Sequence, residues 1–338
     1  MLPILTFFCE LEAQPLEALF TNPQVIPDLK ALNAGISLGL LDFSPERAGV
    51  VQSLNKANIP VTAWLLLPKD QGYWFNSTNA AQAARRYADF KAWTAEHDFK
   101  WAAIGLDIEP NINEAISLTQ DRARLAPTML KRLFDQQSLL RAEMAYASLA
   151  ARIQTDGYLV ESYQFPFIVD ERKAGSTLLK RLAGLVDFHA NREVLMLYSS
   201  FMRPFGDGLI WSYGRQADSI GIGITGGSVE IQAVKDIPPM TWAELTRDLR
   251  LAYHLKKPVH IFCLEGCVKE GYLTRLRTFD WEGPVTEPIE SYQKVHAVRQ
   301  LGQAGLWAAA HPLVVMAGMC ILGCGLSRLF GHRKKCCG

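Results

Sequence analysis

Residues 104–110 read Ile-Gly-Leu-Asp-Ile-Glu-Pro, an apolar run that ends in two acidic residues and a proline. Such a run is typical of a buried strand that stops at the proline. Alternate side chains of a strand share one face, so Asp107 and Glu109 are predicted to converge, about 6.5 to 7 Å apart along the strand. Two carboxylates in one pocket cannot both ionise freely, and one can keep a proton at neutral pH and act as a general acid.

Similar apolar runs recur along residues 1–285 and alternate with amphipathic segments, which is the pattern of parallel β-α units. Eight strands are expected, at 2–9, 36–41, 60–67, 102–108, 157–163, 194–198, 219–224 and 259–264. They predict a closed (β/α)8 (TIM) barrel, a fold of about 250 residues. The segment 111–155 is too long for one crossover helix and is expected to hold an added helical excursion. The stretch 200–218 shows no clear helix.

In such a barrel the reactive groups lie where the strands end. The residues expected there as substrate contacts are Glu10, Asp42, Trp64, Trp74, Glu161, Tyr163 and Glu265. A lone acid at a strand end is more often a helix cap or a solvated charge, and a lone aromatic residue is more often part of the core. The pair Asp107 and Glu109 favours a functional role, because burying two acids costs free energy and is uncommon where the acids have no function.

Two motifs resemble glycoside hydrolase family 18, the chitinase-like barrels. Residues 104–109 resemble the end of the D-x-x-D-x-D-x-E motif on that family's fourth strand, and residues 196–198 (Met-Leu-Tyr) resemble its M-x-Y motif on the sixth. The resemblance implies that Glu109 protonates the glycosidic oxygen and that Asp107 orients a substrate acetamide or modulates the acid. It also implies that Tyr198 contacts an N-acetyl group.

The chain departs from that family at several positions. Ala102 and Gly105 stand where the earlier acids of the fourth-strand motif would be, Ser199 replaces the acid after M-x-Y, and the third strand has no S-x-G-G pattern. The segments 106–110 and 72–76 also resemble those of an uncharacterised group of barrel proteins with a C-terminal anchor, which implies no activity. Trp64 and Trp74 could serve as flat platforms for sugar rings.

Three classes of function follow. The first is a glycoside hydrolase acting on a carbohydrate, in which Glu265 or Glu161 could also act as a carboxylate nucleophile. The second is a magnesium- or manganese-dependent isomerase or phosphoester hydrolase, with oxygen ligands from Glu10, Asp42, Asp107, Glu109 and Glu265. The third is a pseudoenzyme that binds a glycan or a protein without turnover.

The composition limits the classes of partner that the protein is expected to bind. The net charge of +1 over 338 residues gives no reason to expect nucleic acid. The motifs G-x-x-x-x-G-K-[ST], G-x-S-x-G and H-E-x-x-H are absent, so no cofactor and no resident metal are expected. The oligomeric state is left open by the sequence.

The C-terminal part predicts a membrane anchor. Residues 306–326 carry no charge, which is long enough for a transmembrane helix at 306–327. Residues 286–305 are expected to be a linker or stalk, and 328–338 a basic tail in which Cys336 and Cys337 are candidates for acylation. This predicts a single-pass membrane protein, with the side that holds the barrel left open.

Overall fold

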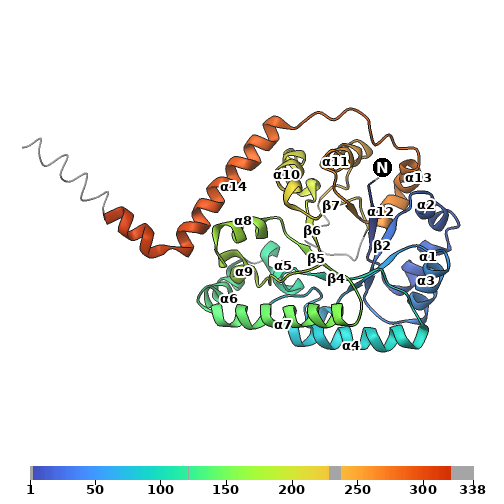
Figure 1. Ribbon diagram of the computed structural model, residues 1–338, viewed down its shortest axis with the longest axis horizontal. Helices are drawn as coiled ribbons and strands as arrows, with labels where there is room; N and C mark the ends of the chain where they lie inside the picture. Colours follow the sequence, from blue (N-terminus) through green and yellow to red (C-terminus); the bar gives the residue numbers. More distant parts are fainter. Residues whose placement is uncertain (1–2, 121, 228–236, 321–338) are drawn as a thin grey trace, which may run out of the picture.

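The predicted barrel is confirmed in a computed structural model, which describes residues 3–120, 122–227 and 237–320. Eight parallel strands close in sequence order, and β1 completes the ring by pairing with β8, Leu5 opposite Val259 (Figure 1). The strands are β1 Leu5–Cys9, β2 Gly35–Leu40, β3 Val61–Leu65, β4 Ala103–Asp107, β5 Val160–Gln164, β6 Arg192–Met196, β7 Ser219–Gly223 and β8 Val259–Phe262.

Helices follow the strands around the outside of the barrel (Figure 1). Capping interactions fix the N-termini of several helices. Ser44 caps α3 by accepting a hydrogen bond from the Arg47 amide, and Thr241 and Glu244 form a capping box at α11. The α-helices are α1 Ala13–Thr21, α2 Val25–Ala31, α3 Pro45–Lys56, α4 Ala80–His97, α5 Ile112–Gln120, α6 Arg122–Phe134, α7 Gln136–Thr155, α8 Phe167–Ala174, α9 Leu178–Ala183, α10 Gly206–Tyr213, α11 Trp242–His254, α12 Leu264–Lys269, α13 Tyr272–Leu276 and α14 Ile289–Ala310.

The long segment after β4 is the expected helical excursion, made of α5, α6 and α7. The stretch 200–218 differs from the sequence analysis, since it holds the helix α10 between the short 3-10 turns η2 (Ser199–Met202) and η3 (Gly214–Gln216). Its glycines permit close packing: a Cβ on Gly208 would lie 2.8 Å from the Cβ of Ser291. Gly208 therefore lets α14 approach α10 closely.

The predicted linker is the first part of α14, and it packs against α8 and α10 rather than leading away from the barrel (Figure 1). The contact is centred on Arg299, whose guanidinium forms a buried ion pair with Asp170 of α8 at 2.6 Å. Arg299 also donates to the backbone oxygen of Ser212 and lies over the Tyr213 ring at 3.5 Å. The helix therefore belongs to the barrel domain.

The anchor prediction is only partly covered by the described residues. Within residues 3–120, 122–227 and 237–320, no helix combines the length and apolarity needed to cross a membrane. α14 ends at Ala310, and a further helical stretch covers 312–320 after an interruption at His311. The rest of the predicted span, 321–327, and the tail with Cys336 and Cys337 lie outside the described residues.

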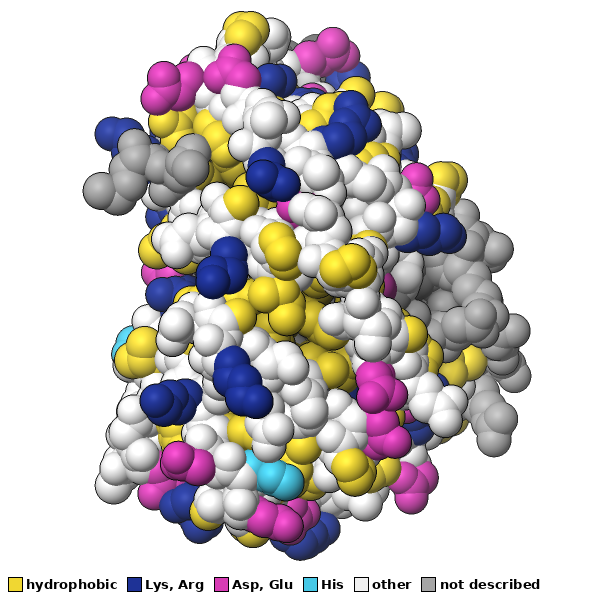
Figure 2. Space-filling view, turned by 90° about the vertical axis from the view of Figure 1, so that its right-hand side faces the viewer, with side chains coloured by type: hydrophobic (Ala, Val, Ile, Leu, Met, Phe, Trp, Pro, Cys, Tyr) yellow, Lys and Arg dark blue, Asp and Glu magenta, His cyan; other side chains and the backbone are white. Residues whose placement is uncertain are grey.

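Charge is mixed on the face seen in Figure 2, which carries both Lys and Arg and Asp and Glu side chains. This agrees with the net charge of +1.

Candidate active site at the mouth of the barrel

The two acids at the end of β4, Asp107 and Glu109, are held in an extended segment between β5 and the loop that holds Phe75. The amide of Ile108 donates to the backbone oxygen of Tyr163 at 3.1 Å, on the β5 side. The amide of Glu109 donates to the oxygen of Phe75 at 3.1 Å, and the Phe75 amide donates to the oxygen of Asp107 at 2.9 Å. The strand geometry thus continues to Glu109, and the alternation that places both carboxylates on one side is kept.

A third carboxylate approaches this pair from β1. Glu10 directly follows β1 and is buried, with only 1% of its surface exposed. Its Oε1 accepts a hydrogen bond from the Tyr73 hydroxyl at 2.7 Å, and its amide donates to Oε1 of Glu265 at 3.3 Å. The carboxyl ends of β1, β4 and β8 therefore bring acidic groups to one place.

Electrostatics show that these acids interact. Burial, and next the charge of Glu10, raise the pKa of Glu109 to about 8, although its side chain keeps part of its surface exposed. Burial raises the pKa of Asp107 well above its usual range, and the charges of Glu109 and Glu10 add to the rise, while the Trp64 indole opposes it. The Oδ1 atom of Asp107 is buried and has no hydrogen-bond partner among the described residues. At neutral pH this group of acids therefore retains a proton.

Tyr198 joins the same cluster from the end of β6. Burial is the main cause of its raised pKa, followed by the negative charges of Asp107, Glu109 and Glu10. A tyrosine beside three acids stays protonated, so its hydroxyl remains available as a hydrogen-bond donor. The structure thus brings together Glu109, Asp107, Tyr198, Glu10 and Glu265.

Asp42 lies outside this cluster. Its carboxylate pairs with the buried guanidinium of Arg47 at 3.0 Å and accepts the Ser44 amide at 2.9 Å. These contacts hold the start of α3, and the Arg47 guanidinium and the Ser44 amide lower the pKa of Asp42 to about 2. Asp42, expected as a substrate contact, is thus engaged by Arg47 and by Ser44, the N-cap residue of α3, apart from the other acids.

Glu161 and Tyr163 lie deeper in the barrel. Glu161 is near the start of β5, where its Oε1 pairs with Arg192 at 2.7 Å and its Oε2 lies 3.5 Å from His260 Nε2. The Tyr163 hydroxyl is 2.6 Å from Ser37 Oγ and 3.3 Å from Glu161. These groups satisfy one another inside the barrel, which is the ordinary role of buried polar residues.

The two expected aromatic platforms are both buried. Trp64 is 2% exposed and makes edge contacts with Phe8 and Tyr163, and Trp74 is 5% exposed against the Tyr73 ring. Neither offers an open face to a sugar in this arrangement. Trp64 instead belongs to an aromatic layer with Phe8, Tyr163 and Phe262 that fills the barrel beneath the acids.

The departures from the family 18 motif have a structural counterpart. A Cβ on Gly105 would lie 2.8 Å from Cζ of Tyr163, so the position of the missing acid is filled by the tyrosine ring. Ser199 does not point to the acids, since its hydroxyl donates to the buried Asp248 on α11. Asp107 and Glu109 therefore lie at the mouth, and the Tyr163 ring occupies the space beside Gly105 where the family motif has an acid.

Tyr73 contacts the acids at the mouth, although the sequence did not connect it with Glu10. Its φ of 64° and that of 106° at Gly72 turn the loop after η1 (Lys69–Gln71) back over the barrel, which brings its hydroxyl to Glu10. A positive φ at a tyrosine is uncommon and marks a conformation imposed by its surroundings. In the sequence, the pair Gly72-Tyr73 after the third strand was the signal that could have indicated this turn.

The expected oxygen ligands do not form a metal centre among the described residues, where no three His, Cys, Asp or Glu side chains are arranged to hold an ion. Asp42, one of those expected ligands, is occupied by Arg47.

Comparison with known proteins finds distant likenesses only. No family model and no curated protein matches the chain. The glycoside hydrolase domain of PgaB (BpsB) from Bordetella bronchiseptica is similar, with a TM-score of 0.47 and 11% identity over 82% of this chain and 98% of that one. A xylose isomerase-like TIM barrel protein from Mycobacterium smegmatis, in complex with magnesium, has a TM-score of 0.37 and 12% identity over 82% and 97%. At this level the likeness carries no argument about function.

Proposed function

We propose that the protein cleaves glycosidic bonds and that Glu109 is the general acid. The observation that carries this proposal is the convergence of Glu10, Asp107 and Glu109 at the mouth, with the pKa of Glu109 raised to about 8. A carboxylic acid that is neutral at pH 7 can protonate a departing sugar oxygen, which an ordinary surface glutamate cannot do efficiently.

Each group has a distinct part in this proposal. Glu109 is the partly exposed acid and donates its proton to the glycosidic oxygen. Asp107 is the more buried of the two acids, and its Oδ1 atom, which has no hydrogen-bond partner among the described residues, would orient a polar group of the sugar. Tyr198 donates a hydrogen bond to the substrate. By the resemblance to family 18, the group that Asp107 and Tyr198 contact would be an N-acetyl group beside the reacting carbon.

The test is hydrolysis of a panel of 4-nitrophenyl glycosides, including N-acetylhexosaminides, by the full chain. Glu109→Gln keeps the size of the side chain and removes the acid, and should lower kcat by about 10² to 10⁴. Glu17→Gln changes an exposed glutamate of α1 in the same way and should leave kcat unchanged. A wild-type rate that Glu109→Gln fails to reduce would reject Glu109 as the acid.

Chelation separates this proposal from the metal-dependent alternative. If carboxylates alone carry the reaction, treatment with EDTA should not change the wild-type rate. Loss of activity in EDTA and its return with Mg²⁺ or Mn²⁺ would favour the isomerase or phosphoester hydrolase class.

A binding protein without turnover is the second candidate, because Tyr163 fills the place of an acid of the family motif at Gly105. This candidate predicts that wild type hydrolyses none of the panel, while binding of a chito-oligosaccharide is measurable and survives Glu109→Gln. Turnover by the wild type would exclude it.

A further inference from the structure

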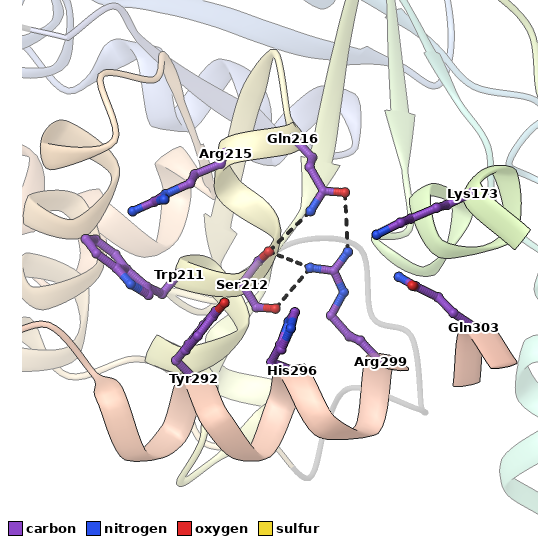
Figure 3. Close-up of a pocket in the computed structure, with 9 residues that line it drawn as sticks. All are labelled: Lys173, Trp211, Ser212, Arg215, Gln216, Tyr292, His296, Arg299 and Gln303. Atoms are coloured by element: carbon purple, nitrogen blue, oxygen red, sulfur yellow. Dashed lines mark hydrogen bonds between the residues drawn. The ribbon is translucent and has the colours of Figure 1, made fainter. Parts of the chain in front are cut away.

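A second site lies on the flank of the barrel, away from the acids of the mouth. It is a groove of about 390 Å³ between α8, α10, η3 and α14 (Figure 3). Its floor is the ion pair of Arg299 with Asp170, whose charges cancel. The guanidinium donors are already used by Asp170, Ser212 and Gln216, so the floor is closed and polar.

The rim of the groove is positive. Lys173 at the end of α8 and Arg215 in η3 are both exposed, and neither forms an ion pair with a described residue. In Figure 3 the Lys173 side chain points over the floor toward Arg299, so its ammonium group faces the groove. None of the residues that line the groove is acidic. The unbalanced charge therefore favours an anionic ligand.

One wall of the groove is aromatic. Tyr292 and His296 rise from α14 on the same side and stack, with ring centroids 5.2 Å apart and planes 18° apart (Figure 3). Trp211 of α10 lies at the end where the Arg215 guanidinium is 5.6 Å from its ring. The groove is larger than an inorganic anion requires and falls within the range of about 300 to 1,000 Å³ found for small-molecule sites.

We propose that this groove binds an organic phosphate whose phosphate contacts Lys173 and whose planar or apolar body lies along Tyr292 and Trp211. Phosphate carries a charge of about −1.5 to −2 and several acceptor oxygens, which suits a lysine with three free donors better than a singly charged carboxylate does. The site is independent of the proposed glycosidase activity, since it shares no residue with the mouth.

The test is isothermal titration of the full chain with phenyl phosphate, inorganic phosphate and benzoate. Phenyl phosphate should bind, and the other two should bind at least about tenfold more weakly. Lys173→Gln should weaken phenyl phosphate about tenfold, whereas Lys56→Gln should not. Lys56 is a matched control, because it is also exposed, in the last turn of its helix and without an ion pair among the described residues.

A second variant checks the aromatic wall. Tyr292→Leu should weaken the binding of phenyl phosphate and leave the affinity for inorganic phosphate unchanged. The melting temperature shows that each variant is folded.

Vesicles of phosphatidylcholine with and without phosphatidic acid distinguish a lipid phosphate from a soluble one. If the protein binds vesicles only when they contain phosphatidic acid, and Lys173→Gln abolishes this binding, the ligand is a lipid headgroup. If the protein binds phenyl phosphate but no vesicles, the ligand is a soluble phosphate ester.

The proposal is overturned if neither phenyl phosphate nor phosphatidic acid vesicles bind in a way that depends on Lys173. Equal affinity for benzoate and phenyl phosphate would also overturn the choice of phosphate.

Discussion

Asp107 and Glu109 are separated by one residue, and they differ in how much water reaches them. Asp107 is 2% exposed, whereas Glu109 keeps part of its surface at the mouth. The outer acid can therefore meet a substrate while the inner one supports its charge state. Because the charge of Glu10 raises the pKa of both, the protonation of the site depends on a residue from another strand.

Replacing Glu10 tests that dependence. Glu10→Gln removes a negative charge that raises the pKa of Glu109, so the pKa should fall and the acid should lose its proton at lower pH. We expect the alkaline limb of the kcat/KM profile to move from about pH 8 toward lower pH. The Tyr73 hydroxyl can still donate to the glutamine oxygen, so packing is preserved. An alkaline limb at the wild-type pH would contradict this, and Glu17→Gln is the control.

Asp107→Asn should stabilise the protein while impairing activity. The folded state raises the pKa of Asp107 above the unfolded value of about 3.9, so it binds more protons than the unfolded state above that pH. Wild-type stability is thus lost as pH rises toward the folded pKa, and the asparagine variant avoids this loss. We expect a gain of about 1 to 2 kcal/mol near pH 8 and less near pH 5, measured by urea unfolding. No gain from Asp107→Asn at either pH, or the same gain from the exposed Asp70→Asn, would contradict the prediction.

At the scale of residues, the sequence located the paired acids because strand alternation is a local rule. It placed Asp42 in the site as well, since nothing local shows that Arg47 captures the carboxylate. It gave Tyr73 no contact with Glu10 because that hydrogen bond joins positions 63 apart in the chain. Contacts of this range depend on how loops cross the barrel mouth.

At the scale of elements, α14 shows how a buried ion pair can attach a helix that carries few buried residues. Its buried residues are Val295, Arg299 and Leu306, so the helix has little apolar surface with which to dock. Asp170 receives donors from Arg299, Tyr213 and Gln303, which tie α14 and α10 to α8.

Asp170→Asn should therefore loosen this attachment. It leaves the Arg299 guanidinium buried without its counter-charge, which costs about 3 to 5 kcal/mol in comparable buried pairs. The free energy of unfolding in urea and hydrogen exchange of the α14 amides would measure the effect. Glu290→Gln, which breaks the exposed pair with Lys294 on the same helix, should have little effect. Equal effects of the two changes would contradict a role for the buried pair.

The elements themselves differed in how well they could be foreseen. The strands were predictable because most of them are short apolar runs between turn residues, although β5 (Val160–Gln164) and β6 (Arg192–Met196) also contain charged residues. α10 was not, because its glycines resemble loop residues in the sequence and serve in the fold to admit close neighbours. The sequence lacked a signal for α10 because the role of its glycines depends on a tertiary contact, the close approach of α14.

At the scale of the whole molecule, the barrel separates an acidic mouth from an ion-paired interior. Glu161, Arg192 and His260 lie near the starts of β5, β6 and β8, at the end opposite the mouth. In barrel enzymes this end serves stability and the other end serves chemistry.

Glu161→Gln should therefore lower the free energy of unfolding by about 1 to 3 kcal/mol, because it removes the charge facing Arg192 and the buried His260. It should leave the kcat/KM profile unchanged, in contrast to Glu10→Gln. Measuring both quantities on both variants completes the test. A changed pH profile without a stability loss would place Glu161 among the substrate contacts after all.

The aromatic layer beneath the mouth affects how the acids exchange protons with their surroundings. Phe8, Trp64, Tyr163 and Phe262 pack across the barrel below Asp107 through edge and tilted contacts, and the Tyr163 hydroxyl keeps its proton because burial raises its pKa well above the usual range. The aromatic layer thus separates the acids from the interior, and the direct route for a proton to enter or leave is through the mouth. In the glycosidase proposed here, a sugar bound over the mouth would therefore exchange a proton with the acids before the solvent does.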